Sequence, residues 1–370
     1  MKARVENVFA NLDPKPDVVL LANAVDPHID GSFFYLFGVP SGLFEGSFAV
    51  AHPDGSLDVA SSPLEAESAH LAAKHDPHVK VHVVATRADG EALLKKLVPA
   101  SANVGLNYRE LTHSWYVRLN ETFPGAKFFD AGTAIQKARA VKDASEVEKI
   151  RTAAEIGSKV AREIPSLLRA GLTESQLAAE MEYSMNKHGA NGPSFSTIVG
   201  FGPHSAEPHY APDDTPLRPG QSMVCDFGAR YRRYACDITR SFHFGPRDDE
   251  LKAVHECVEE AQQAALAVLR PGIAGKEVHQ AAERVIDASP WKGRFTHGLG
   301  HALGLAVHDQ GPGLAPTSDE LLEVGMVVTV EPGIYLPGKG GVRIEDDVVI
   351  TKNGYEFLTT APRGYVEVSA

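Results

Sequence analysis

The sequence predicts a two-domain α+β protein, in which a smaller N-terminal α/β domain precedes a larger domain with helices covering a curved antiparallel sheet. First, the 370 residues exceed what one compact domain commonly needs. Second, short apolar runs alternate with turn signals up to about residue 138. Third, a pair of helical patterns followed by strand patterns occurs twice beyond that point, which indicates two similar halves. We place the domains at residues 1–138 and 139–370.

The N-terminal part is predicted to alternate strands with helices. Apolar runs predict strands, and longer patterned stretches between them predict helices. The strands are expected at 17–22, 33–37, 48–51 and 79–85, and the helices at 63–74 and 90–97. Histidines in this part are scattered, so we expect them to be surface or structural residues.

Four helices are predicted in the second domain. The first follows residue 137, with Asp143 or Ser145 as its N-cap, and the second spans 174–187 with Thr173 as its cap. The other two span 248–269 and 276–287, each with glycine or proline nearby. Strand patterns separate the two pairs, as in a layer of helices over a sheet.

Composition excludes several classes of function. Hydrophobic residues make up 43% of the chain and charged residues 23%, as in an ordinary globular protein. The formal net charge of −12 argues against a nucleic-acid or anionic-membrane partner. The three cysteines show no paired spacing, and the N-terminus shows no signal-peptide pattern. We therefore expect a cytoplasmic protein.

Residues 223–244 form the stretch that first suggests chemistry. Two apolar runs flank a polar centre, which predicts a hairpin turning near residues 229–233. Such a hairpin would place Asp226 opposite Asp237 on one face, because side chains alternate along a strand. Aspartates are usually exposed to solvent, but Asp226 and Asp237 are both flanked by apolar residues. Facing carboxylates repel, so we expect a metal ion or a metal pair between them.

Further candidate ligands occur in the later strand patterns. His297, His301 and His308 lie among glycines, and neutral imidazole is a common metal ligand. Glu331 and Glu345 each interrupt an apolar, β-rich segment. A buried carboxylate needs a cation, an arginine or hydrogen bonds, so each glutamate alone is explained by a structural role. Together with the aspartates they form a coherent ligand set.

The charge of this set predicts a dinuclear centre. Four carboxylates carry about four negative charges, which matches two divalent cations sharing a water. Oxygen-rich ligands without thiolate favour manganese or cobalt, and also accommodate zinc or iron. The residues by themselves therefore predict a metal-assisted hydrolase.

These segments resemble the Xaa-Pro peptidases, the prolidases and proline-specific aminopeptidases with the pita-bread fold. The resemblance rests on residues 195–212, 223–244, 297–309 and 325–351, and covers the chain from about residue 138. It implies that two divalent metal ions are bound in each subunit. The implied metal ligands are Asp226, Asp237, His301, Glu331 and Glu345, with Asp237 and Glu345 bridging both ions.

The resemblance also implies roles for residues around the metals. His209 and His308 match histidines that line the substrate pocket and assist the tetrahedral intermediate, whereas His297 matches a non-ligand near the site. Arg343 matches an arginine that assists substrate binding or supports the metal ligands. Tyr234 is similar to a tyrosine near the bridging aspartate. Glu331 would also carry a proton to the departing nitrogen.

The implied activity is hydrolysis of the bond between an N-terminal residue and proline. The resemblance leaves two activities open: a dipeptidase, which the chain length favours, or an aminopeptidase acting on longer peptides. A creatinase-like hydrolase or a non-catalytic pita-bread binding module would lack the full ligand set that is present here. Partners are then a proline-containing di- or oligopeptide and a second subunit in a homodimer.

Overall fold

The computed structural model describes residues 1–370, which divide into two compact units, Met1–Arg139 and Ala140–Ala370. From the sequence we expect this boundary between residues 138 and 139. None of the helices in either unit combines the length and the apolar character that crossing a membrane requires.

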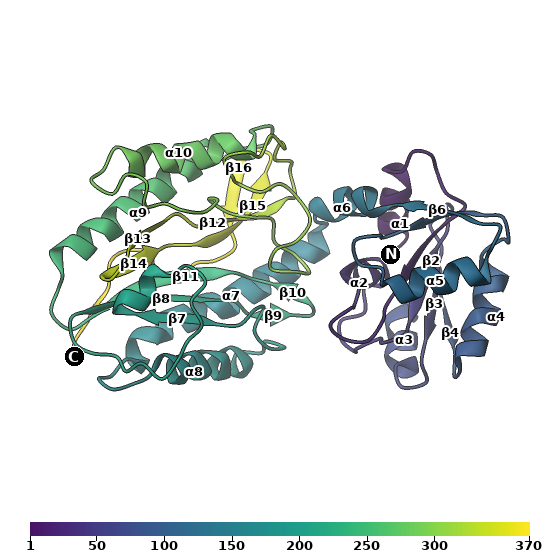
Figure 1. Cartoon of the computed structure of the whole chain (residues 1–370), viewed down its shortest axis with the longest axis horizontal. Helices are drawn as coiled ribbons and strands as arrows, with labels where there is room; N and C mark the ends of the chain where they lie inside the picture. The colour runs from purple at the N-terminus through teal and green to yellow at the C-terminus, as the bar shows by residue number, and fades with distance from the viewer. The chain divides into compact units, whose positions relative to one another are not determined.

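A six-stranded mixed sheet forms the centre of the N-terminal unit (Figure 1). Its strand order is β4-β3-β2-β1-β5-β6, with β2 antiparallel to both neighbours and the other pairs parallel. The strands are β1 Val18–Ala22, β2 Phe48–Ala51, β3 Leu57–Ser61, β4 Val79–Val83, β5 Asn103–Leu106 and β6 Lys127–Asp130. The helices are α1 Lys2–Ala10, α2 Gly31–Phe37, α3 Ala66–Ala73, α4 Arg87–Leu97, α5 His113–Thr122 and α6 Gly132–Ala140.

Helix α2 corrects the prediction of a strand at residues 33–37. The Asp30 side chain accepts a hydrogen bond from the Ser32 amide at 2.7 Å and caps the helix. Gly38, with φ of 71°, ends it in the left-handed conformation. Between these signals, Phe33 and Phe37 pack on Phe44 with ring centroids 5.6 and 5.8 Å apart. A short apolar run fits a buried strand or helix equally well, and here the caps decide for the helix.

The second unit consists of two helix pairs, each followed by strands (Figure 1). Helices α7 and α8 pack on strands of the first half, and α9 and α10 pack on each other, with α9 contacting strands of the second half. Each half has its own buried apolar cluster. The elements are α7 Ala144–Leu167, α8 Glu174–Lys187, β7 Ile198–Phe201, η1 Gly202–Ala206, β8 Gln221–Phe227, β9 Arg230–Tyr231, β10 Tyr234–Ala235, β11 Ile238–Phe244, α9 Asp249–Val268, α10 Gly275–Asp287, β12 Val327–Val330, β13 Gly333–Leu336, β14 Gly340–Arg343, β15 Asp346–Thr351, β16 Gly354–Phe357 and β17 Glu367–Val368.

Capping explains where the first two helices of this unit begin. Asp143 caps α7: its carboxylate accepts from the Glu146 amide at 2.9 Å, and the Glu146 carboxylate accepts from the Asp143 amide at 3.0 Å. Thr173 and Gln176 form the same reciprocal pair at α8. The helix expected from residue 137 is therefore two helices, because α6 ends at Ala140 before the cap.

The predicted hairpin is present, but its register differs from the expectation. Strands β8 and β11 pair with Asp226 opposite Thr239, and the chain turns at Arg232 and Arg233, which both have positive φ. Asp237 lies two residues before Thr239, in the gap between β10 and β11. The aspartates therefore share a face as diagonal neighbours and are not directly opposite.

Candidate metal centre

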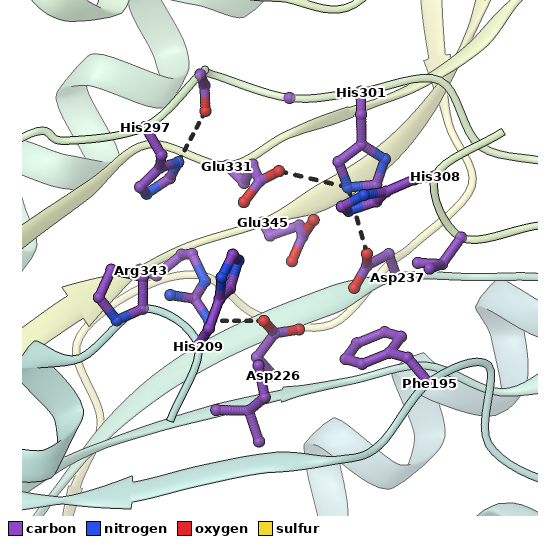
Figure 2. A pocket seen from close by; sticks show the side chains of 15 residues that line it. Phe195, His209, Asp226, Asp237, His297, His301, His308, Glu331, Arg343 and Glu345 are labelled. Atoms are coloured by element: carbon purple, nitrogen blue, oxygen red, sulfur yellow. Dashed lines mark hydrogen bonds and ion pairs between the residues drawn. The ribbon is translucent and has the colours of Figure 1, made fainter. Parts of the chain in front are cut away.

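Side chains from several strands and loops of the second unit converge on one cavity of about 410 Å³ (Figure 2). The cavity contains four carboxylates and four histidines, together with an apolar wall. Its lining residues are Phe195, Ile198, Pro208, His209, Asp226, Asp237, His297, Gly298, Gly300, His301, Val307, His308, Glu331, Arg343 and Glu345. All five predicted metal ligands are among them.

Strand ends place the four carboxylates. Asp226 is the penultimate residue of β8, and Asp237 immediately precedes β11. Glu331 directly follows β12, and Glu345 lies between β14 and β15. Asp226, Asp237 and Glu345 are 9%, 5% and 1% exposed, so their charges face the cavity instead of bulk water. Backbone pairing thus brings together residues far apart in the sequence.

His301 connects two of these carboxylates. Its Nε2 lies 3.6 Å from Asp237 Oδ2 and 3.5 Å from Glu331 Oε1 (Figure 2). Thr329 supports this arrangement because its hydroxyl accepts from the His301 amide at 3.0 Å. The His308 ring lies beside His301, with centroids 4.0 Å apart. A predicted metal ligand and a second histidine of the pocket therefore lie side by side.

A buried hydrogen-bond chain supports the opposite side of the cavity. Arg343 Nη2 donates to Asp226 Oδ2 at 2.6 Å, and its Nη1 donates to the Tyr335 hydroxyl at 2.8 Å. The Tyr335 oxygen also lies 2.8 Å from Nε2 of His297. On Glu345, Oε2 accepts from the Thr239 hydroxyl at 2.6 Å. These contacts orient the side chains before any ligand arrives.

Burial shifts the pKa values of this site strongly. Desolvation, reinforced by neighbouring carboxylates, raises the pKa of Asp237 and Glu345 well above the ordinary values. Burial raises the pKa of Glu331 to about 8. Desolvation lowers the pKa of His297 and His301 to about 4, so both imidazoles are neutral at pH 7. Neutral imidazoles beside crowded carboxylates suit cation binding.

The arrangement fits two divalent metal ions. One oxygen of each of Asp226, Asp237 and Glu345 is buried without any hydrogen-bond partner. Buried carboxylate oxygens without partners are costly, and a cation at this position would satisfy them. In addition, the ligand atoms of Asp237, His301 and Glu345 lie within 4.8 Å of one another. The donor set thus fits the dinuclear centre expected from the sequence.

The remaining predicted residues divide into two groups. His209, His297, His308 and Arg343 line the cavity. Tyr234 does not: it is 3% exposed, and its hydroxyl donates to Glu146 Oε1 on α7 at 2.9 Å. The structure therefore places Tyr234 in a contact with helix α7, away from the pocket wall.

Several supporting residues were missed by sequence reasoning. Tyr335 and Thr239 hold pocket side chains, and Asp347 Oδ2 accepts from the Asp237 amide at 3.0 Å. Arg230 donates to the backbone oxygens of Ser194 and Leu305 at 2.8 and 3.0 Å, joining two segments that line the cavity. Thr239 and Asp347 each lie two residues from a predicted ligand, so strand alternation could have placed them near the site.

Comparison with known proteins adds independent information. Residues 148–352 match metallopeptidase family M24, and residues 22–141 match the creatinase/prolidase N-terminal domain. An uncharacterised peptidase of Bacillus subtilis is 37% identical over 260 residues, 70% of this chain and 73% of that protein.

Solved structures resemble the chain over almost its whole length, as two of them show. The X-Pro aminopeptidase of Thermotoga maritima has 34% identity and a TM-score of 0.89, covering 99% of this chain and 100% of that one. The Xaa-Pro dipeptidase of Bacillus anthracis has 31% identity and a TM-score of 0.88, covering 99% and 98%. Both share the two-domain architecture found here.

Proposed function

Because the chain belongs to metallopeptidase family M24, we propose that it is an exopeptidase that hydrolyses the bond between an N-terminal residue and proline. The observation that carries the proposal is the complete set of four carboxylates and one histidine in one cavity. A module that only binds peptides would not need three buried carboxylates that each keep one oxygen without a hydrogen-bond partner. We propose an Xaa-Pro dipeptidase as the specific activity.

We assign the metal-binding role to Asp226, Asp237, His301, Glu331 and Glu345, with manganese or cobalt favoured by the oxygen-rich set. When bound, such a metal pair lowers the pKa of a shared water and polarises the scissile carbonyl. The ligand residues themselves hold their positions through the buried contacts of Thr239, Arg343 and Thr329. Gly300 lets the backbone before His301 pass close to the strand that ends at Val330, because a Cβ there would clash with the Thr329 carbonyl oxygen.

Proton transfer is proposed for Glu331 and the histidines. Glu331 lines the cavity, where its carboxylate would take a proton from the attacking water. The Glu331 carboxyl group would then pass that proton to the nitrogen of the departing proline. His209 would donate a hydrogen bond to the oxygen of the scissile carbonyl as charge develops there. His308, Arg343 and His297 would orient the rest of the substrate.

The substrate preference follows from the chemistry of proline. A bond before proline lacks the N–H that strand-like peptide recognition uses, so a dedicated pocket is needed. Phe195, Ile198, Pro208 and Val307 supply an apolar wall in the cavity that suits a pyrrolidine ring. The likeness to the Thermotoga maritima X-Pro aminopeptidase favours a second candidate, cleavage of longer peptides.

We also propose a homodimer located in the cytoplasm. Symmetric dimers are the commonest soluble oligomers, and the composition and cysteine usage suit a reducing compartment. Size-exclusion chromatography with light scattering at several protein concentrations tests the dimer: a species of twice the chain mass is expected, and a monomer throughout would contradict it.

The experiment that tests the activity compares Ala-Pro, Ala-Pro-Ala and Ala-Ala as substrates. Metal-stripped protein is resupplied with manganese, cobalt or zinc before each assay. Cleavage of Ala-Pro alone is the result expected for a dipeptidase, and preference for Ala-Pro-Ala would assign the aminopeptidase activity instead. Failure to cleave either proline peptide with every metal would contradict the proposal.

A further inference from the structure

Glu174 is a completely buried carboxylate that does not line the metal cavity. It is the first residue of α8 and is 0% exposed. Burial raises its pKa, although hydrogen bonds from Phe201 and His204 oppose the shift. A charge in such a position is retained only if its oxygens are satisfied by good donors. Its partners therefore indicate what it does.

All of the hydrogen bonds to the Glu174 carboxylate come from residues 201–213. Oε1 accepts from the Phe201 amide at 2.7 Å and from His204 Nδ1 at 3.0 Å. Oε2 accepts from the Asp213 amide at 3.3 Å. The first and last of these donors lie at the two ends of the segment. One carboxylate thus closes the segment into a loop.

The same loop carries the pocket histidine. Pro208 and His209 line the cavity, and the next residue, Tyr210, stacks on the His204 ring with centroids 4.4 Å apart. His204 is itself held by Glu174 at 3.0 Å. A path of direct contacts therefore runs from Glu174 to His204 and from His204 to Tyr210, which follows His209 in the chain.

Glu174, His204 and Asp213 could also be grouped as ligands of a cation. The hydrogen bonds argue against that reading. Both Glu174 oxygens accept backbone N–H groups, and Asp213 Oδ1 accepts from the Thr215 amide at 2.7 Å. A cation would compete with these donors, whereas in the metal cavity three carboxylate oxygens have no partner.

We propose that Glu174 is a positioning residue for His209: by holding both ends of residues 201–213 and the His204–Tyr210 stack, it keeps the His209 imidazole at the cavity. The catalytic consequence rests on the proposed function, in which His209 stabilises charge on the scissile carbonyl. The loop-closing role itself does not, and it can be measured separately.

The kinetic test is a double-mutant cycle of Glu174→Gln and His209→Ala. Glutamine keeps the size of glutamate but turns one acceptor oxygen into a donor that repels a backbone N–H. We expect E174Q to lower kcat on Ala-Pro about tenfold with a smaller change in KM and unchanged metal content. In the H209A background E174Q should have no further effect, because both changes remove the same contribution.

The structural test is hydrogen–deuterium exchange of the whole chain. Exchange in residues 202–213 should rise in E174Q, while β8 and β11 stay as protected as in the wild type. Glu180→Gln is the matched control, since Glu180 lies on the same helix and pairs with Arg169 at the surface. It should change neither exchange nor kcat. If E174Q does not fold, His204→Phe keeps a ring against Tyr210, removes the donor to Glu174, and enters the same cycle.

Two results would overturn the inference. One is an equal fall in kcat from E174Q with and without His209, since the two residues would then act independently. The other is unchanged exchange in residues 202–213. A wild type that cleaves no Xaa-Pro peptide would overturn the proposed function instead, and exchange would still decide whether Glu174 holds the loop.

Discussion

Tyr335 shows how a single hydroxyl can join two parts of the site. It accepts from Arg343, which holds Asp226, and it contacts His297. The sequence pointed to Asp226 through its apolar setting and to His297 through its glycine-rich setting, and the family resemblance implied Arg343. It did not identify Tyr335, whose surroundings look like those of any strand tyrosine. Which buried tyrosine reaches the site depends on tertiary packing: the resemblance implied Tyr234, whose hydroxyl donates to Glu146 on α7.

The first prediction concerns Tyr335→Phe. Loss of the hydroxyl removes the partner of Arg343 Nη1 and of His297 Nε2, at a cost of about 1–3 kcal/mol for a bond to a charged group. We expect kcat/KM on Ala-Pro to fall about tenfold or more, with metal content preserved because Tyr335 is not a proposed ligand. Steady-state kinetics with metal analysis measures both. If the Tyr335→Phe variant had the same kcat/KM as the wild type, the hydrogen-bond chain would be dispensable.

His255 provides a pH-dependent test away from the metals. Both of its ring nitrogens are buried without partners, beside the Tyr365 ring, and desolvation and Arg240 lower its pKa to about 4. The folded protein keeps this imidazole neutral, whereas the unfolded chain binds a proton below a pKa of about 6.5. Its contribution to stability is therefore present above that pH and is lost as pH falls toward 4.

The second prediction is that His255→Leu reduces this pH dependence. Between pH 7 and pH 5 the free energy of unfolding should fall by about 2 kcal/mol less in the variant than in the wild type. Urea unfolding at both pH values measures the difference, and the other histidines cancel because both proteins contain them. Equal pH dependence would mean that His255 is protonated in the folded protein.

The hairpin that carries Asp226 and Asp237 shows how far a sequence pattern predicts a single structural element. Alternation correctly placed Asp226 and Asp237 on one face, but the turn position was needed to fix which residues pair. No Asn-Gly or Asp-Gly marks that turn, so the register was off by two residues. The starts of helices α7 and α8 were easier to predict, because Asp143 and Thr173 cap them in the expected way. Helix α2 was missed, since its apolar run is short.

The third prediction concerns the hairpin turn. Arg232 and Arg233 have φ of 46° and 76°, which cost L-residues about 1–2 kcal/mol each, whereas Asn-Gly is preferred in a two-residue turn of this kind. The double variant Arg232→Asn/Arg233→Gly should therefore raise the free energy of unfolding by about 1 kcal/mol. The backbone oxygen that Arg230 contacts is retained. Chemical unfolding measures the change, and a destabilised double variant would show that the arginine side chains outweigh the backbone strain.

At the scale of the whole molecule, the chemistry lies in one unit. All five proposed ligands belong to Ala140–Ala370, and both halves of that unit contribute: Asp226 and Asp237 come from the first, and His301, Glu331 and Glu345 from the second. The fold class was predictable from the repeated order of helix pairs and strands, and the four carboxylate ligands were predictable because carboxylates inside apolar strands are rare. The supporting contacts were not, because they join segments that only the folded chain brings together.

The central claim is that this carboxylate cluster binds two metal ions and that hydrolysis depends on them. The most direct measurement is metal content together with Ala-Pro hydrolysis for the wild type, Asp237→Ala, Glu345→Ala and the exposed control Asp319→Ala. We predict about two ions per chain and activity in the wild type and the control, and loss of both properties in the two cavity variants. Full activity in either cavity variant, or in the wild type after its metals are removed, would contradict the account.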